Sequence, residues 1–179
     1  PDPPPSPYTG CYFAALQGRI AYLETSRGCP FSCSFCLSGV KEKVRFFEME
    51  RAKENLVRLA NSGAKTIKFI DRTFNCHPDR AYELLSFILD QRGQTFPEDV
   101  CFHFEVGADL FQPRFLALLA TAPPGLIQIE AGLQSFCETT LEAVDRKTDL
   151  TVLTENLRQC IRPHNVHVHI DLIAGLPYE

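Results

Sequence analysis

The sequence predicts an α/β protein in which about five parallel strands, with helices on the outside, form part of a barrel. Strand-like runs alternate five times with helical patterns, and no short hairpin signal occurs between them, which favours parallel pairing. The later strands each have one apolar and one polar face. A sheet buried on both faces would be apolar throughout, and a closed barrel would fill its interior with branched apolar side chains. The polar face therefore predicts an open lumen lined by water.

The first half of the chain supplies two strands and two helices. Residues 19–25 (RIAYLET) form the first predicted strand and residues 66–70 (TIKFI) the second. The helix between them, residues 48–61, has an apolar stripe at helical spacing, formed by Met49, Ala52, Leu56, Leu59 and Ala60. Gly63 marks its end. The next helix, residues 78–91, opens with a Pro-Asp pair, which suits a first helical turn.

The second half adds three strands whose side chains alternate. In residues 100–106, Phe102, Phe104 and Val106 share one face, and His103 and Glu105 lie on the other. The last two strands, which alternate in the same way, span residues 126–131 (LIQIEA) and 166–174 (VHVHIDLIA). The remaining helices are expected over residues 113–120, 137–144 and 151–161.

Composition and charge narrow the class of protein. The 179 residues, of which 45% are apolar and 22% charged, suit one globular domain. A net charge of -4 excludes a broadly basic nucleic-acid binder. No apolar run approaches the roughly 18 residues that span a bilayer, and no signal segment begins the chain. We therefore expect a cytoplasmic protein with reduced thiols and no membrane partner.

The first seven residues contain five prolines, a composition that cannot build a packed core. We interpret residues 1–17 as a proline-rich linker or N-terminal extension, with a frayed terminus as the alternative. The folded domain is expected over residues 18–179.

Three of the eight cysteines, Cys29, Cys33 and Cys36, lie close together directly after the first strand. Such a set of soft thiolates can hold an iron–sulfur cluster, and three ligands on four irons leave one iron open to a small molecule. The alternatives are unrelated thiols, or a zinc site completed by Cys11 or Cys76. The single cysteines at positions 101 and 160 fall in apolar patterns and are expected to be buried.

The segment from Arg27 to Cys36 (RGCPFSCSFC), with the aromatic Phe35 before its last cysteine, resembles the signature of the radical S-adenosylmethionine (SAM) superfamily. The resemblance implies a partial (β/α)6 barrel, of which residues 18–179 would lack the sixth strand. It also implies a [4Fe-4S] cluster, SAM bound at the open iron, and reductive cleavage of SAM to a 5′-deoxyadenosyl radical. A reductant such as flavodoxin or ferredoxin would be a partner. Arg27 is a candidate cation beside the cluster.

Two later motifs, residues 130–136 (EAGLQSF) and 170–177 (IDLIAGLP), resemble the coproporphyrinogen-oxidase-like and cobalamin-dependent branches. The resemblance implies that Gln134 and Asp171 bind the SAM ribose, and that Glu105 and Arg146 hold its methionine end. These residue types suit hydroxyl, ammonium and carboxylate partners. All four are expected at or just past the C-terminal ends of strands.

Some polar residues keep two interpretations. Where many family members have a Gly-Gly-Glu-like turn, this chain has Asp71, which would accept from the SAM ammonium group or else serve helix entry or a salt bridge with Arg72. Glu130 is a candidate lumen residue. The histidines on the polar face are either substrate-side acid/base groups or hydrogen-bonded lumen residues: His103, His167 and His169.

The resemblance implies that the chain is the radical SAM core of a cobalamin-associated Fe–S oxidoreductase or methylase. Because no Asp-x-His-x-x-Gly motif occurs, cobalamin would bind only through a domain outside this chain. The alternatives are a methylthiotransferase-like RNA-modifying enzyme and a non-catalytic zinc-bound scaffold. Since an open sheet has two unpaired edges, the chain should either dimerise through them or cover one with its own termini.

Overall fold

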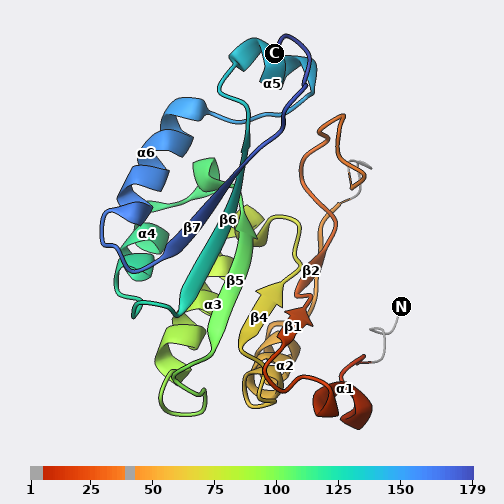
Figure 1. Ribbon diagram of the computed structural model, residues 1–179, viewed down its shortest axis with the longest axis vertical. Helices are drawn as coiled ribbons and strands as arrows, with labels where there is room; N and C mark the ends of the chain where they lie inside the picture. Colours follow the sequence, from red (N-terminus) through yellow and green to blue (C-terminus); the bar gives the residue numbers. More distant parts are fainter. Residues whose placement is uncertain (1–5, 39–42) are drawn as a thin grey trace.

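The computed structural model describes residues 6–38 and 43–179, so four of the five N-terminal prolines lie outside the described residues. Its centre is a parallel sheet in the order β1-β4-β5-β6-β7 (Figure 1). The strands are β1 (Ile20–Leu23), β4 (Thr66–Phe69), β5 (Cys101–Val106), β6 (Ile127–Gln134) and β7 (His167–Leu172). Within the described ranges the sheet is open, with β1 and β7 at its edges. The predicted α/β fold class is confirmed.

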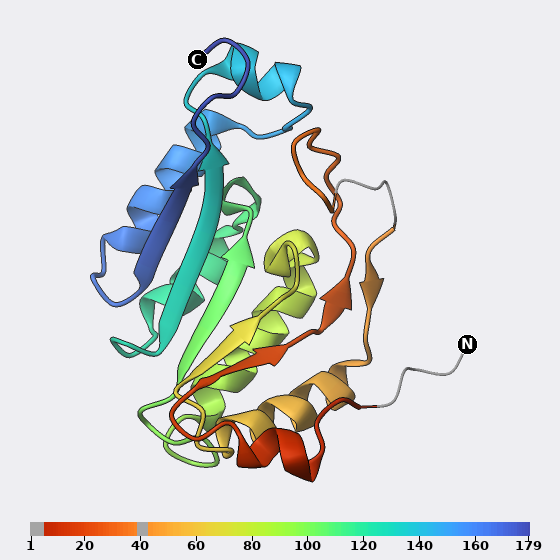
Figure 2. The same cartoon turned by 45° about the vertical axis from the view of Figure 1, so that its right-hand side comes forward.

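Most helices lie on the outer side of the curved sheet (Figure 2). The helices that follow the strands are α2 (Met49–Ala60), α3 (Pro78–Gln91), α4 (Pro113–Ala120), α5 (Glu138–Ala143) and α6 (Leu150–Ile161). Side-chain caps start two of them: His77 accepts from the backbone N–H of Arg80 at α3, and Asp149 accepts from Val152 at α6. No helix in the described ranges is long and apolar enough to cross a membrane.

Some short elements were not predicted. They are α1 (Gly10–Ala14), the antiparallel pair β2 (Ser26–Arg27) and β3 (Arg45–Phe46), and the 3-10 turns η1 (Phe74–Cys76) and η2 (Ala108–Leu110). Elements of two to five residues are too short to show a period of either 2 or 3.6, so the sequence pattern carries no signal for them.

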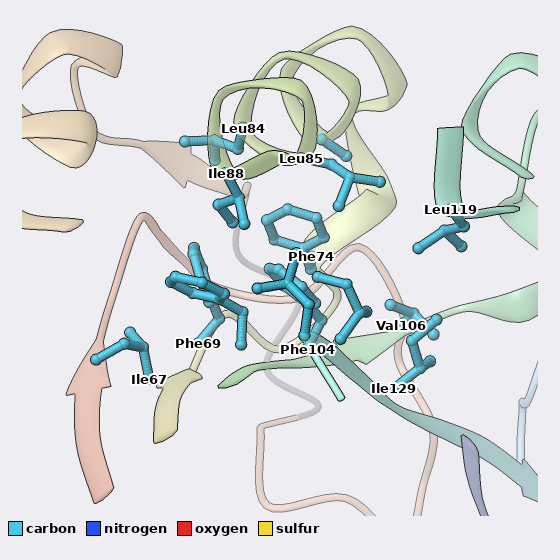
Figure 3. Close-up of a cluster of buried hydrophobic side chains, with 14 of the residues drawn as sticks. Ile67, Phe69, Phe74, Leu84, Leu85, Ile88, Phe104, Val106, Leu119 and Ile129 are labelled. Carbon is cyan, nitrogen blue, oxygen red and sulfur yellow. The ribbon is translucent and has the colours of Figure 1, made fainter. Parts of the chain in front are cut away.

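The core lies between the sheet and the outer helices. Phe69, Phe74 and Phe104 form a compact aromatic group, with ring centroids 4.3 to 5.3 Å apart. The side chains of α3 close over it, among them Leu84 and Ile88 (Figure 3). The opposite face of β5 is only partly buried, and burial alternates residue by residue along β5 and β6. The lumen face is therefore polar and accessible, as the alternation predicted.

The N-terminal segment covers part of the β1 edge. The Tyr8 hydroxyl donates to the Tyr22 carbonyl at 3.0 Å, and the Tyr22 N–H donates to the Tyr12 hydroxyl at 3.3 Å. Tyr8 and Leu16 are themselves buried. Part of the predicted extension thus supplies hydrogen-bond partners to an edge strand, which is one of the two expected ways of protecting an edge.

Candidate functional site

A cavity of about 230 Å³ opens between the cysteine loop, residues 28–38, and the C-terminal ends of β5, β6 and β7. Cys29, Cys33 and Cys36 all line it. It is also lined by most of the other predicted site residues: Phe35, Glu105, Gln134, Arg146 and Asp171. Residues spread over more than 140 positions of sequence thus come together because parallel strands end at the same side of the sheet.

The three cysteines differ in exposure. Cys33 is buried, Cys29 is half-buried and Cys36 is exposed. The Cys29 sulfur lies 3.7 Å from the Thr73 hydroxyl, a hydrogen-bond distance for sulfur. Gly28, with φ +102°, lets the backbone turn from β2 into the loop. Across residues 6–38 and 43–179, no three His, Cys, Asp or Glu side chains are close enough to hold a single metal ion.

Arg146 reaches the cavity from an unexpected place. It lies in the turn between α5 and α6, not at a strand end, so the expected position is wrong. Its guanidinium donates to the Gly132 carbonyl at 2.9 Å, lies 3.8 Å from the Cys33 sulfur and stacks 5.1 Å from the centre of the Phe31 ring. The Arg146 Nε is buried without a hydrogen-bond partner. A buried donor of this kind suits a site that takes an anionic ligand.

Gln134 ends β6 in a left-handed conformation, with φ 70°, next to an irregularity in its pairing with β7. A Cβ on Gly132 would lie 2.2 Å from the Gln134 amide nitrogen. Only glycine therefore leaves room for this amide to fold back over the strand. Asp171 is the register partner of Gly132, which places its carboxyl at the same end of the lumen.

An ion-pair network lies below these residues in the lumen. The Lys68 ammonium is 3.3 Å from Glu105 and 3.1 Å from Glu130, and His103 Nε2 is 3.0 Å from Glu130. Burial acts to raise the pKa of Glu130, but the hydrogen bond and charge of Lys68, with those of His103, outweigh it and lower that pKa. Lys68 was not among the predicted site residues, although its position between Ile67 and Phe69 in the strand indicates that its side chain faces the lumen.

Asp171 and the other lumen histidines sit beside this network. Burial raises the pKa of Asp171, and the charge of Glu130 raises it further. The ring centroids of His103 and His169 are 6.2 Å apart, and those of His167 and His169 are 4.4 Å apart. The predicted polar face is thus a continuous group of ionisable side chains.

The structure does not bring two predicted residues to the cavity. Asp71 is 2% exposed and accepts from the backbone N–H groups of Thr25 and Ser26, at 2.6 and 3.1 Å, and from the Thr25 hydroxyl. Its carboxylate therefore anchors the exit of β1 and does not line the cavity. Arg27 pairs with Glu24 at 2.5 Å and does not line the cavity. The arginines that line the cavity are Arg72 and Arg146.

The sequence model of the radical SAM superfamily matches residues 23–179. The chain belongs to this superfamily. Members of it are enzymes that use a [4Fe-4S] cluster and SAM. The cobalamin-dependent radical SAM methyltransferase TokK of Streptomyces tokunonensis is 30% identical over 98% of this chain. A 2-(S-pantetheinyl)-carbapenam-3-carboxylate methyltransferase of Streptantibioticus cattleyicolor is also 30% identical over 98% of the chain. The chain spans 27% of the length of each of these relatives.

Solved structures share the fold at lower identity. The radical SAM methyltransferase TsrM of Kitasatospora setae superposes with a TM-score of 0.77 over 92% of this chain and 32% of its own, at 19% identity. The coproporphyrinogen III oxidase HemN of Escherichia coli superposes with a TM-score of 0.64 over 96% of this chain and 42% of its own, at 17% identity. These likenesses support the partial-barrel architecture.

Proposed function

We propose that this chain is the radical SAM core of a cobalamin-dependent methyltransferase, in which Cys29, Cys33 and Cys36 hold a [4Fe-4S] cluster that cleaves SAM reductively. The observation that carries the proposal is that the three thiols line one cavity with most of the residues expected to bind SAM. The relation to two methyltransferases over nearly the whole chain supports the reaction class. When bound and reduced, the cluster supplies the electron for SAM cleavage.

Each end of SAM has matching side chains. The Arg146 guanidinium, with its unpaired Nε, suits the methionine carboxylate, and Glu105 suits the ammonium group. Gln134 and Asp171 suit the ribose hydroxyls. The half-exposed Phe35 ring offers apolar contact to the adenosyl part. Asp71 is left out of this set, because its carboxylate is satisfied by Thr25 and Ser26.

The proposal includes partners beyond the chain. A flavodoxin or ferredoxin would supply the electron, and cobalamin would bind through a domain outside these residues. A reducing, cytoplasmic setting suits a site made of free thiols.

Metal analysis after anaerobic reconstitution with iron and sulfide tests the proposal. The wild-type chain should bind about four irons with matching sulfide, as a [4Fe-4S] cluster requires. Changing any one of Cys29, Cys33 and Cys36 to Ala should abolish the broad visible absorbance. Cys160→Ala is the matched control, since its sulfur is buried in the core and should be dispensable. One zinc and no iron would replace the proposal with a zinc-bound scaffold.

A further inference from the structure

The cysteine loop is fastened to one short turn, residues 144–146, between α5 and α6. The Ser34 N–H donates to the Val144 carbonyl at 2.9 Å, and the Ser32 hydroxyl donates to the Asp145 carboxylate at 2.5 Å. Arg146 also contacts this loop, through the Phe31 ring and the Cys33 sulfur. Four consecutive loop residues thus meet three consecutive turn residues across more than 100 positions of sequence.

The turn is itself firmly held. The Arg146 N–H donates to the Leu141 carbonyl at 2.9 Å, and the Asp145 N–H donates to the Glu142 carbonyl at 3.1 Å. This is the hydrogen-bond pattern of a helix C-terminus that is capped by a residue in the left-handed conformation. Leu141 and Val144 are buried beneath it. Movement of this turn would break buried packing, so it is a rigid support for the loop.

Asp145 occupies a position where glycine would suit the backbone best. Its φ of 53° is left-handed, where glycine is the residue most often found at the end of a helix. A carboxylate here also adds negative charge near three cysteines that act as thiolates when they bind iron. Glycine would suit this backbone better than Asp, and electrostatics disfavour a carboxylate here, but the Ser32 hydrogen bond is an interaction that glycine could not make.

We propose that Asp145 is a positioning residue for the iron–sulfur cluster. Its carboxylate holds Ser32, between Cys29 and Cys33, and so limits the movement of the loop that carries these cysteines. A loop that is ordered before iron binds loses less conformational entropy on binding, so it retains iron more firmly. This inference rests on the proposed function, because it assumes that the three cysteines are cluster ligands.

The test uses the full chain, reconstituted anaerobically, and measures loss of visible absorbance in excess iron chelator. Asp145→Gly keeps the left-handed backbone and removes the carboxylate, and Ser32→Ala removes the donor. Each should release iron roughly tenfold faster than wild type, the size expected for one charge-assisted hydrogen bond at a partly exposed site. The double variant should be no faster than the faster single variant, because the hydrogen bond that Ser32→Ala removes is already lost in Asp145→Gly.

Two controls separate positioning from stability. Ser34→Ala changes an exposed side chain whose backbone makes the contact, so it should behave as wild type. Without iron, Asp145→Gly should unfold at nearly the same urea concentration as wild type, since the gain from glycine in a left-handed backbone offsets the lost hydrogen bond to Ser32. A merely structural role would instead lower that midpoint.

The iron-release measurements distinguish a failure of the Asp145 inference from a failure of the proposed function. If wild type retains iron and neither Ser32→Ala nor Asp145→Gly differs from Ser34→Ala, the inference about Asp145 is wrong and the proposed function stands. If wild type takes up no iron, the proposed function is wrong and this inference fails with it.

Discussion

Replacing Asp71 with Ala should destabilise the protein more than any exposed substitution. Asp71 accepts from Thr25 N–H at 2.6 Å, from Ser26 N–H at 3.1 Å and from the Thr25 hydroxyl, and it is 2% exposed. Leaving one buried donor unsatisfied costs roughly 1–3 kcal/mol, and the three are not additive because a hydroxyl can rotate to a new partner. We expect a loss of about 2–5 kcal/mol in the free energy of unfolding.

Urea unfolding of the chain without iron measures this loss. Asp90→Ala is the control, since it removes an exposed aspartate from α3 and should change stability by no more than about 0.5 kcal/mol. Asp71→Asn should be milder than Asp71→Ala, because it keeps one acceptor and the volume. If Asp71→Ala were as stable as Asp90→Ala, the anchoring role of this carboxylate at the exit of β1 would be refuted.

The pH dependence of the free energy of unfolding tests the burial of Asp71 independently. Burial raises the pKa of Asp71 above its ordinary 3.8, although hydrogen bonds from Thr25 and Ser26 oppose the rise. The folded state therefore binds the proton more readily than the unfolded state, and the resulting stability is lost as the pH rises through the folded pKa. Relative to Asp71→Asn, the wild type should gain stability as the pH falls from 7 toward 4.

Four further substitutions test the β1 edge, the lumen ion pairs and the SAM-binding residues. Tyr8→Phe removes a hydrogen bond to the edge strand and should lower the free energy of unfolding by about 1 kcal/mol, with stronger self-association in sedimentation. Lys68→Met leaves the partly exposed Glu105 and Glu130 without the Lys68 ammonium group. It should lower the free energy of unfolding by about 0.5–1.5 kcal/mol at pH 7, measured in urea, and this loss should shrink toward pH 4 as the carboxylates take up protons. Arg146→Ala should weaken SAM binding roughly 10- to 150-fold in calorimetry of the cluster-loaded protein and leave methylthioadenosine binding almost unchanged, whereas Asp171→Asn should weaken both. Equal responses of the two ligands to the two variants would contradict the assignment.

The sequence pattern predicted much of the sheet because the later strands alternate apolar and polar side chains, although β7 is exposed along most of both faces. The burial of β5, with Phe102 and Phe104 inside and His103 and Glu105 toward the lumen, follows residue by residue from period 2. Strand ends in a parallel sheet meet at one side, so the cavity and most of its lining followed from topology and the cysteine spacing together.

What the sequence could not predict are contacts that depend on how distant loops meet. Ser32 and Asp145 are ordinary polar residues in the sequence, and only the folded chain shows that they touch. Arg146 was expected at a strand end, but a left-handed turn after α5 brings it back over Gly132. Asp71 directly follows a strand, as a ligand-binding carboxylate would. In the folded chain, however, its carboxylate accepts hydrogen bonds from the backbone of Thr25 and Ser26 and does not line the cavity.

The proposed function depends on three cysteines that hold a cluster with one iron open to SAM. The most direct measurement is the electron paramagnetic resonance spectrum of the reconstituted, reduced wild-type chain before and after SAM is added. We predict the signal of a reduced [4Fe-4S] cluster that changes when SAM is added, because the ligand binds the iron that lacks a cysteine. A chain that yields no iron–sulfur signal, or a signal that SAM leaves unchanged, would contradict the account.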